Sequence, residues 1–453
     1  MIRGVEKLKA AECGVVTAGA LQRWKYWSPW KVRPTAHVRA SAGARAGRLR
    51  NDLFDAVCCQ AATQVPSGIL LSGGLDSTAL LAIHRHIFGH APDTYTISFT
   101  PPRGQAKRSE YDEADYAEEV AGWYQSRHTH EQVSARQVLD MLPRIVADLD
   151  EPVADPTAIP LWFACRMAHE AGVKVLFSGE GLDELFGGYG VYQQVRWLRA
   201  LQMLPVTLRQ SLSNFLARFE LPGSGVMRRS TRPVWDWYQG VGGLFSSHER
   251  KALFLQPVQK WLGSYDPDCH MHRCLLQSNA IRTPDVLTQM MVFDFCTWLP
   301  ENTLIKSDKV SMAHSIELRV PFLDRRVVEY AWSLPVDDKV HGRTGKWIVR
   351  RALSGIVPPF VLRRQKAGFP VPLTAWMFGE WKEFAWDTLL NPRSVTRQYY
   401  RGDAIARLFN IEPAQRRRAA RLLWAMITLE LWIQHLQMTS ATGFDLPSCA
   451  LSK

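Results

Sequence analysis

Short apolar runs alternate with longer amphipathic stretches between residues 50 and 190. Runs of this kind are typical of buried strands, and a helical period in the stretches between them is typical of helices that cover a sheet. The pattern predicts strands over 69–71, 94–99, 128–133 and 174–177, and helices over 47–63, 77–88, 111–123, 135–148 and 161–171. Strands that alternate with helices imply a parallel sheet, whose ligands lie at the carboxyl ends of the strands.

After residue 190 the strand signals fade and helical periods dominate. They predict helices over 196–217, 285–294, 325–334, 346–353 and 414–437. We therefore expect an α/β part over 51–195, which would bind a nucleotide, and a mainly helical part over 196–440 that adds a C-terminal helical layer. Residues 1–50 predict one strand over 15–21 and a linker rich in Trp, Pro and Ala, and residues 441–453 predict a flexible tail.

Composition narrows the class of protein. A chain of 453 residues that is 46% apolar can bury a large core. It has no apolar run long enough for a membrane span and no signal peptide at its start, and its eight cysteines lack regular spacing. We therefore expect a cytoplasmic protein with reduced thiols and no membrane partner.

Positive charge is concentrated at the start of the chain. The net charge is +12, and residues 1–50 hold eleven Lys and Arg against Glu6 and Glu12, a difference of +9. Because aromatic and basic residues do not form a recognisable RNA- or DNA-binding module here, a solvated basic face is favoured over nucleic-acid binding.

The segment Ser72-Gly73-Gly74-Leu75-Asp76-Ser77 joins the first predicted strand to its helix. Glycines let backbone N–H groups approach a ligand, and a helix N-terminus favours anions, so this turn predicts a phosphate site. The lysine of the kinase-type loop is absent, and Asp76 stands among the anion-binding groups instead. A carboxylate there is expected where Mg²⁺ bridges it to phosphate, as in the pyrophosphate loop of enzymes that split ATP between its α- and β-phosphates.

A second glycine-rich turn follows the strand at 174–177. Residues 178–189 hold Glu180, Asp183 and Glu184 among four glycines. Three acids crowded together repel one another unless a cation neutralises them. We expect Asp183 to face Asp76 across a crevice and to complete a Mg²⁺ site, and Glu180 to handle a proton or orient an amine.

Several motifs later in the chain, taken together with these two turns, resemble those of a known family. They are the segments 302–312, 315–324 and 363–370, together with Asp150-Glu151-Pro152, Asp155-Pro156 and Gly345-Lys346-Trp347. Over residues 50–437 or so, the chain resembles the synthetase half of glutamine-dependent asparagine synthetase. That resemblance implies the adenine nucleotide α-hydrolase-like sheet, ATP and Mg²⁺ as substrate and cofactor, and the joining of ammonia to a carboxylate.

The resemblance also implies roles for single residues. Leu71, Ile97, Ser178 and Gly179 would form the nucleotide pocket, Ser72, Gly73, Gly74, Asp76 and Ser77 would hold pyrophosphate, and Asp76 and Asp183 would carry Mg²⁺. Lys366 is similar to the family lysine that stabilises charge on the phosphates, and Glu180 to the residue near the incoming ammonia. Glu317 and Arg319 resemble parts of the acceptor pocket, although a structural Glu–Arg pair would explain them as well.

The start of the chain departs from that family. The full enzyme carries Cys at position 2 as the nucleophile of its glutaminase domain, whereas Ile2 stands here and residues 1–35 resemble only the end of that domain. Glutamine hydrolysis by this chain is therefore not expected. Three explanations stay open: the chain uses free ammonia or another amine, a separate glutaminase subunit supplies ammonia, or the start codon was placed late. A homodimer is a further expectation.

Other functions share parts of this pattern. Lasso-peptide cyclases and β-lactam synthetases have the same fold, lack a working glutaminase and close an amide within one molecule. A tRNA-modifying enzyme that adenylates a base would share the S-G-G-x-D-S loop, and a truncated chain could act only as an interaction protein. The segments 311–315 and 366–370 favour the ordinary amide-forming ligase.

Overall fold

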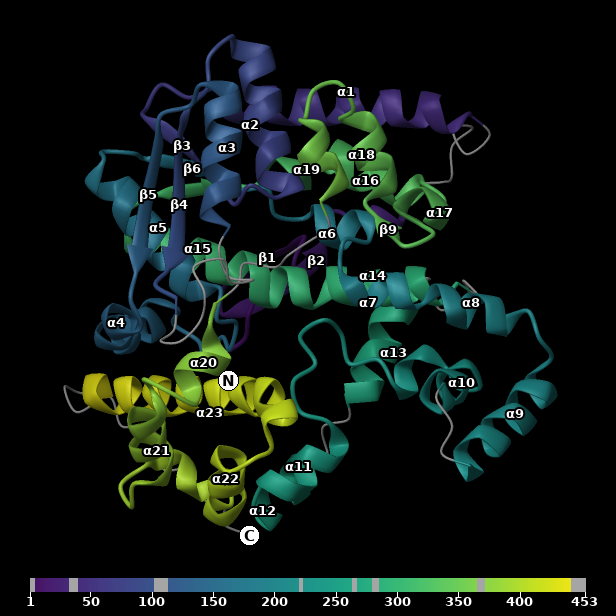
Figure 1. Ribbon diagram of the computed structural model, residues 1–453, viewed down its shortest axis with the longest axis vertical. Helices are drawn as coiled ribbons and strands as arrows, with labels where there is room; N and C mark the ends of the chain where they lie inside the picture. Colours follow the sequence, from purple (N-terminus) through teal and green to yellow (C-terminus); the bar gives the residue numbers. More distant parts are fainter. Residues whose placement is uncertain are drawn as a thin grey trace.

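The computed structural model describes residues 5–31, 40–101, 113–219, 223–262, 267–278, 285–364 and 371–440. At its centre is a five-stranded parallel sheet with strand order β5-β4-β3-β6-β7 (Figure 1). The strands are β3 (Ser67–Leu70), β4 (Asp93–Phe99), β5 (His128–Val133), β6 (Val175–Phe177) and β7 (Glu317–Arg319). The predicted α/β class with an added helical layer is confirmed.

Helices cover both faces of the sheet. One face packs on α1 (Ala42–Ala61), α2 (Leu75–Phe88), α3 (Ala114–Tyr124), α16 (Arg325–Ser333), α18 (Trp347–Ala352) and α19 (Pro359–Arg363). The other packs on α4 (Ala135–Asp148), α5 (Ala158–Glu170) and α15 (Ile305–Ala313). Strand alternation sorts the side chains: Val175 and Phe177 enter the first core, and Leu176 enters the second.

The C-terminal helices extend the second core below the sheet. They are α20 (Leu373–Met377), α21 (Lys382–Leu390), α22 (Gly402–Phe409) and α23 (Arg416–Ser440). Trp376 joins them to β4, with its ring centroid 5.0 Å from that of Phe99 and 4.6 Å from that of Trp381. The arrowheads of β4 and β5 point toward this layer (Figure 1), so the ligand edge of the sheet faces the C-terminal helices.

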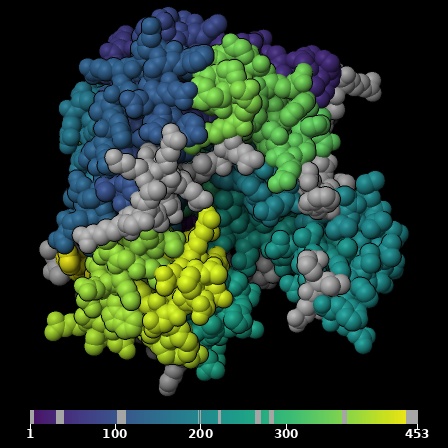
Figure 2. Space-filling view, viewed as in Figure 1, coloured from purple at the N-terminus to yellow at the C-terminus, as the bar shows by residue number. Residues whose placement is uncertain are grey.

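A third cluster of helices lies beside this layer. It contains α7 (Gly190–Gln194), α8 (Arg196–Gln202), α9 (Val206–Arg218), α10 (Ser224–Ser230), α13 (Pro267–Gln277) and α14 (Val286–Cys296). The helix α11 (Ser247–Leu253) instead packs on α22, with Leu253 in the second core, and α12 (Gln256–Leu262) follows it. Short elements connect the parts: β1 (Glu12–Thr17), β2 (Ala20–Lys25), α6 (Leu182–Phe186), a π-helix over Leu299–Leu304, α17 (Val336–Lys339), β8 (Val340–His341), β9 (Thr344–Gly345) and 3₁₀ turns at 29–31, 234–236, 321–323, 395–398 and 413–415. Figure 2 shows the three parts meeting around the middle of one face.

Two predicted elements are wrong in detail. The stretch over 15–21 is not a single strand but spans the end of β1, a turn and the start of β2, because Ala18 and Gly19 both adopt positive φ (51° and 80°) and reverse the chain. The single helix over 196–217 is two helices, α8 and α9, because Pro205 lacks the N–H that would continue the first.

The strand β7 was not predicted. It has three residues, two of them charged, so it has neither an apolar run nor a clear alternation. It pairs with β6 through Val175 and Glu317, Leu176 and Leu318, and Phe177 and Arg319. The sheet therefore draws its last strand from the mainly helical part of the chain. No helix within the described ranges combines the length and apolarity that a bilayer crossing needs.

A buried carboxylate anchors the third cluster. Asp294 of α14 is fully buried and accepts hydrogen bonds from the Tyr192 hydroxyl (2.5 Å), the Tyr238 hydroxyl and the Val241 amide (2.9 Å). Burial raises the pKa of Asp294 to about 6, although these three donors oppose the shift.

This raised pKa predicts a pH-dependent stability. The native chain keeps a proton on Asp294 that the unfolded chain has lost, so the contribution is present below about pH 4 and is lost as the pH rises through about 6. Relative to Asp294→Asn, which cannot titrate, the parent should lose roughly 3 kcal/mol between about pH 4 and about pH 7. Urea unfolding midpoints of both proteins at the two pH values measure the difference, and parallel pH curves would contradict it.

Candidate active site

The first loop of the site follows β3 and leads into α2. Ser72 donates its backbone N–H to the Ser77 hydroxyl (3.1 Å), and Gly74 donates its own to the Ser72 hydroxyl (3.3 Å). Gly73 has a φ of +65°, and a Cβ there would lie 2.7 Å from Tyr116 of α3. A glycine is thus required for the loop to turn so close to α3. Asp76 lies in the first turn of α2, beside these hydroxyls.

The second loop follows β6 and abuts the first. The backbone N–H of Ser178 donates to the Arg319 carbonyl (2.9 Å), which continues the pairing of β6 with β7. A Cβ at Gly179 would lie 2.7–2.9 Å from the backbone and Cβ of Asp76, so only glycine permits this contact. The two glycine-rich turns, which were predicted to share one crevice, therefore lie in direct contact.

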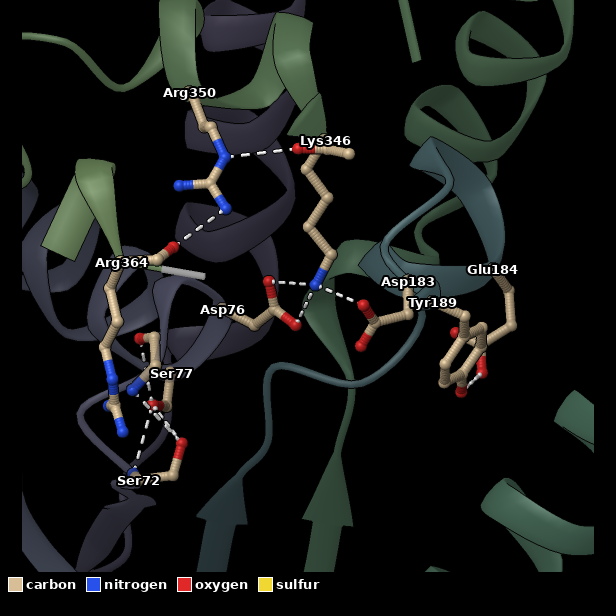
Figure 3. A network of polar contacts seen from close by, with 11 residues as sticks. Ser72, Asp76, Ser77, Asp183, Glu184, Tyr189, Lys346, Arg350 and Arg364 are labelled. Atoms are coloured by element: carbon tan, nitrogen blue, oxygen red, sulfur yellow. Dashed lines mark hydrogen bonds and ion pairs between the residues drawn. The ribbon is translucent and has the colours of Figure 1, made fainter. Parts of the chain in front are cut away.

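One lysine ammonium lies between the two predicted metal carboxylates. Lys346 Nζ is 2.7 and 2.5 Å from the two carboxylate oxygens of Asp76 and 2.6 Å from Asp183 Oδ1. Figure 3 shows the lysine reaching down between the aspartates, which come from α2 and α6. A Cβ at Gly188 would lie 1.7 Å from that Asp183 oxygen and 2.4 Å from Lys346 Cε, so the walls around the group are backbone.

Lys346 is held in this place by its backbone. It has a φ of 54°, in the left-handed region that a lysine adopts at an energetic cost, and its N–H donates to the Phe186 carbonyl (2.9 Å). Its side chain is only 5% exposed. Burial alone would lower the pKa of the ammonium, but the charges of Asp183 and Asp76 outweigh burial and raise that pKa.

Glu180 belongs to a separate polar group on the same loop. Its Oε1 accepts a hydrogen bond from the Ser307 hydroxyl of α15 (2.6 Å), and its Oε2 is buried with no hydrogen-bond partner among the described residues. Burial raises the pKa of the Glu180 carboxyl, although Lys306 and Ser307 partly oppose it. A buried carboxylate with one vacant acceptor is suited to receive an N–H donor.

Lys306 and Asp155 form the neighbouring ion pair. Lys306 Nζ lies 2.7 Å from Asp155 Oδ2 and 2.6 Å from the Thr157 hydroxyl, and the Asn302 amide donates to the same Asp155 oxygen (3.0 Å). Burial opposes the ionisation of Asp155, but Lys306 and the hydrogen bonds lower its pKa to about 2. Both charges of this pair act on Glu180, since Lys306 lowers the pKa of its carboxyl and Asp155 raises it.

Two arginines tie the remaining loops to this site. Arg364 donates to the Gly73 carbonyl (3.1 Å) and to Glu113 (3.2 Å), and its guanidinium lies 3.9 Å from the ring centroid of Tyr116. Arg350 of α18 donates to the carbonyls of Gly345 (3.1 Å) and Arg364 (3.2 Å). The turn that carries Lys346 and the first loop are thus linked by a continuous set of hydrogen bonds (Figure 3).

The other predicted residues have the following places. Leu71 is buried just after the end of β3, at the ligand edge of the sheet, and Ile97 is buried within β4. Arg319 donates to Glu317 (2.8 Å) and to the Gln60 carbonyl of α1 (2.6 Å), so the pair is engaged on the α1 face of the sheet. Its role in an acceptor pocket stays a prediction. Lys366 lies outside the described residues.

Several residues of this site have no role predicted from the sequence. They are Lys346, Lys306 and Asp155, which lie within the motifs that match the family. No local signal indicated this role, because a lysine rarely adopts the left-handed φ of 54° that Lys346 has at the N-cap of α18. Which carboxylates it would meet could not be read from the chain, because they lie 270 and 163 positions away in sequence.

The sequence of this chain is similar to those of known proteins. The asparagine synthase family model matches residues 48–434. The chain belongs to the asparagine synthase family. It is 31% identical over 388 residues to asparagine synthetase [glutamine-hydrolyzing] 1 of Bacillus subtilis, and 35% identical over 395 residues to a putative asparagine synthetase [glutamine-hydrolyzing] of Mycobacterium bovis. A maize asparagine synthetase [glutamine-hydrolyzing] is 30% identical over 374 residues.

The matches leave part of each relative uncovered. They span 85%, 86% and 78% of this chain, but 58%, 57% and 46% of the three relatives. The family match begins at residue 48, within the first long helix α1, so the shared region is the synthetase region with its sheet and helical layers.

The contact between the two loops predicts the effect of Gly179→Ala. The added methyl group would overlap the backbone of Asp76, and the clash should destabilise the fold by about 1–3 kcal/mol. Gly122→Ala is the matched control, because its Cβ meets nothing within 4 Å and alanine is favoured inside α3. Thermal unfolding should show a lower Tm for Gly179→Ala alone. An unchanged Tm would mean that the loops are farther apart than described.

Proposed function

We propose that this chain is an ATP-dependent amide-forming ligase that converts aspartate, ATP and ammonia to asparagine, AMP and pyrophosphate in the cytoplasm. The observation that carries the proposal is the meeting of Asp76 and Asp183 at the ligand edge of a parallel sheet, in a member of the asparagine synthase family. Two carboxylates from two glycine-rich loops beside a helix N-terminus suit a metal-chelated polyphosphate.

The nucleotide would bind along this edge. Leu71 and Ile97 would flank the adenine, with Ser178 and Gly179 closing the pocket. The hydroxyls and N–H groups of residues 72–77 would hold pyrophosphate. The donor set of Asp76 and Asp183 fits Mg²⁺, because both are hard oxygen ligands and both already reach one cation. When bound, Mg²⁺ would neutralise charge on the phosphates.

The first chemical step charges the acceptor. A carboxylate oxygen of aspartate attacks the α-phosphorus of ATP, the bond from that phosphorus to the bridging oxygen breaks, and acyl-adenylate and pyrophosphate form. Negative charge accumulates on the phosphates, so fixed cations and backbone donors should supply most of the acceleration. In this proposal Lys346 and Lys366 are those cations, and Arg350 and Arg364 keep the loops in place.

The second step forms the amide. Ammonia attacks the activated carbonyl carbon, the bond to the AMP oxygen breaks, and AMP leaves. The vacant Oε2 of Glu180 would accept an N–H of the incoming ammonia and orient it, and its raised pKa suits transfer of a proton. Glu317 and Arg319 would contribute to the pocket for the acceptor, as the family resemblance implies.

Ammonia would reach this chain either free in solution or from a glutaminase. The β1–β2 hairpin is exposed, with Val16 at 71% and Leu21 at 50% of their full exposure. An exposed hairpin with apolar side chains is a surface on which a glutaminase domain or a separate glutaminase subunit could pack. Free ammonium should also support the reaction, because the proposed second step needs only ammonia beside Glu180.

The carboxylates give the direct test of this function. Asp76→Asn and Asp183→Asn remove the metal ligands with little change of shape, and each should lower aspartate- and ammonium-dependent pyrophosphate release by about 10²–10³-fold. Asp140→Asn, which changes an exposed carboxylate of α4, is the control and should keep full activity.

Three results would contradict the proposal. Full activity of both site variants would exclude the metal role, and release with a peptide or a β-amino acid but not with aspartate would indicate intramolecular amide closure. Binding of tRNA that weakens with salt, without pyrophosphate release on addition of aspartate, would indicate a base-modifying enzyme.

A substitution of Glu180 should affect the second chemical step more than the first. Glu180→Gln keeps the size of the side chain but cannot take a proton, so asparagine formation should fall by about 10²-fold or more. Aspartate-dependent exchange of labelled pyrophosphate into ATP should stay within a few-fold of the parent, because the exchange needs only the first step. Equal losses in both assays would place Glu180 in the nucleotide site instead.

A further inference from the structure

Lys346 occupies the position at which a metal would meet both carboxylates. Its Nζ is within 2.7 Å of three oxygens, two of Asp76 and one of Asp183. Metal–oxygen distances for Mg²⁺ are about 2.0–2.1 Å. An ion that bound the same oxygens would therefore lie close to the ammonium, and two cations at such a distance repel strongly in a buried site.

The residues around Lys346 restrict the movement of its side chain. Its side chain is buried, Gly188 lies against its Cε, and its backbone is fixed to Phe186 on one side and to Arg350 of α18 on the other. If the ammonium moved next to apolar groups, its buried charge would have no partner, and the free energy of the site would rise by several kcal/mol. A new anion that bound inside the site could attract the ammonium away from the two aspartates.

The phosphate loop is where such an anion would come. Asp76 lies in the first turn of α2, beside the N–H groups and hydroxyls of residues 72–77, so phosphates bound there would reach the ammonium from the same side. The lysine side chain is long and flexible and carries a compact charge, so its head can transfer from a carboxylate to a phosphate oxygen.

We propose that Lys346 is the resident counter-ion of the nucleotide-free site and keeps divalent metal out until a polyphosphate draws its ammonium away from Asp76 and Asp183. This inference rests on the proposed function for the identity of the polyphosphate. It gives the site an order of binding: metal enters with the nucleotide and not before it. The lysine then passes from the aspartates to the phosphates and can take part in the first chemical step.

The test measures metal binding without any reaction. Mn²⁺ is added to the full chain without nucleotide, and its free concentration is followed by electron paramagnetic resonance. The parent should bind Mn²⁺ at this site at least about tenfold more weakly than Lys346→Met, which removes the charge but keeps a long side chain. Lys339→Met is the matched control: Lys339 is also buried, with its ammonium 4.2 Å from the ring centroid of Trp332, and its loss should leave Mn²⁺ binding like the parent's.

A second measurement uses thermal unfolding. Mg²⁺ alone should raise the Tm of Lys346→Met, where two carboxylates face each other without a cation, and should leave the Tm of the parent unchanged. Mg²⁺ together with ATP should raise the Tm of the parent. The Tm of the parent with Mg²⁺ alone and with Mg²⁺ and ATP needs no variant, so this measurement tests the order of binding even if Lys346→Met does not fold.

The outcomes separate this inference from the proposed function. Mn²⁺ binding by the parent as tight as by Lys346→Met would overturn the inference, and so would absence of binding in both. If the parent binds Mn²⁺ only with ATP but releases no pyrophosphate with aspartate, the binding order holds and the proposed reaction fails. If it releases pyrophosphate yet binds Mn²⁺ tightly without nucleotide, the reaction holds and the binding order is wrong.

Discussion

The ion pairs of one buried lysine with two aspartates hold the active region of this protein together. Asp76, Asp183 and Lys346 come from three segments that are distant in sequence, and each would be unfavourable in its place without the others. Two partly buried carboxylates repel, and a buried ammonium without a partner costs several kcal/mol. The loop after β3, the loop after β6 and the turn before α18 must therefore come together for any of the three to be stable.

Glycines make that meeting geometrically feasible. Gly73 lets the first loop turn against α3, Gly179 lets the second loop touch Asp76, and Gly188 leaves room for the Asp183 carboxylate. A Cβ at any of these three positions would overlap its neighbours and force the backbone there to move. Backbone packing thus sets the distances between the charges, and the charges in turn stabilise the packing.

The loop at 178–188 divides the site into two chemical environments. Asp183 faces the lysine and the phosphate loop, while Glu180, three positions earlier, faces Ser307 and the pair of Lys306 with Asp155. The first environment suits anionic oxygens, and the second suits a group that donates N–H. The proposed reaction would use both, because it releases pyrophosphate at the α-phosphorus and then adds ammonia at the carbonyl carbon. The mainly helical part of the chain supplies Ser307, Lys306 and Lys346, so neither environment is complete with the first half of the chain alone.

The sequence by itself determined the local elements and the chemistry of single loops. Strand and helix periods are short-range properties, which is why α4 and β5 were predicted at their observed bounds and why two acid-bearing glycine turns could be recognised after β3 and β6. Only the tertiary structure decided what lies between those turns. The short charged strand β7, the partnership of Lys346 with Asp76 and Asp183, and the hydrogen bond from Ser307 to Glu180 all depend on contacts between segments more than 100 positions apart. Such contacts follow from the packing of the whole core, and no local pattern of residues encodes them.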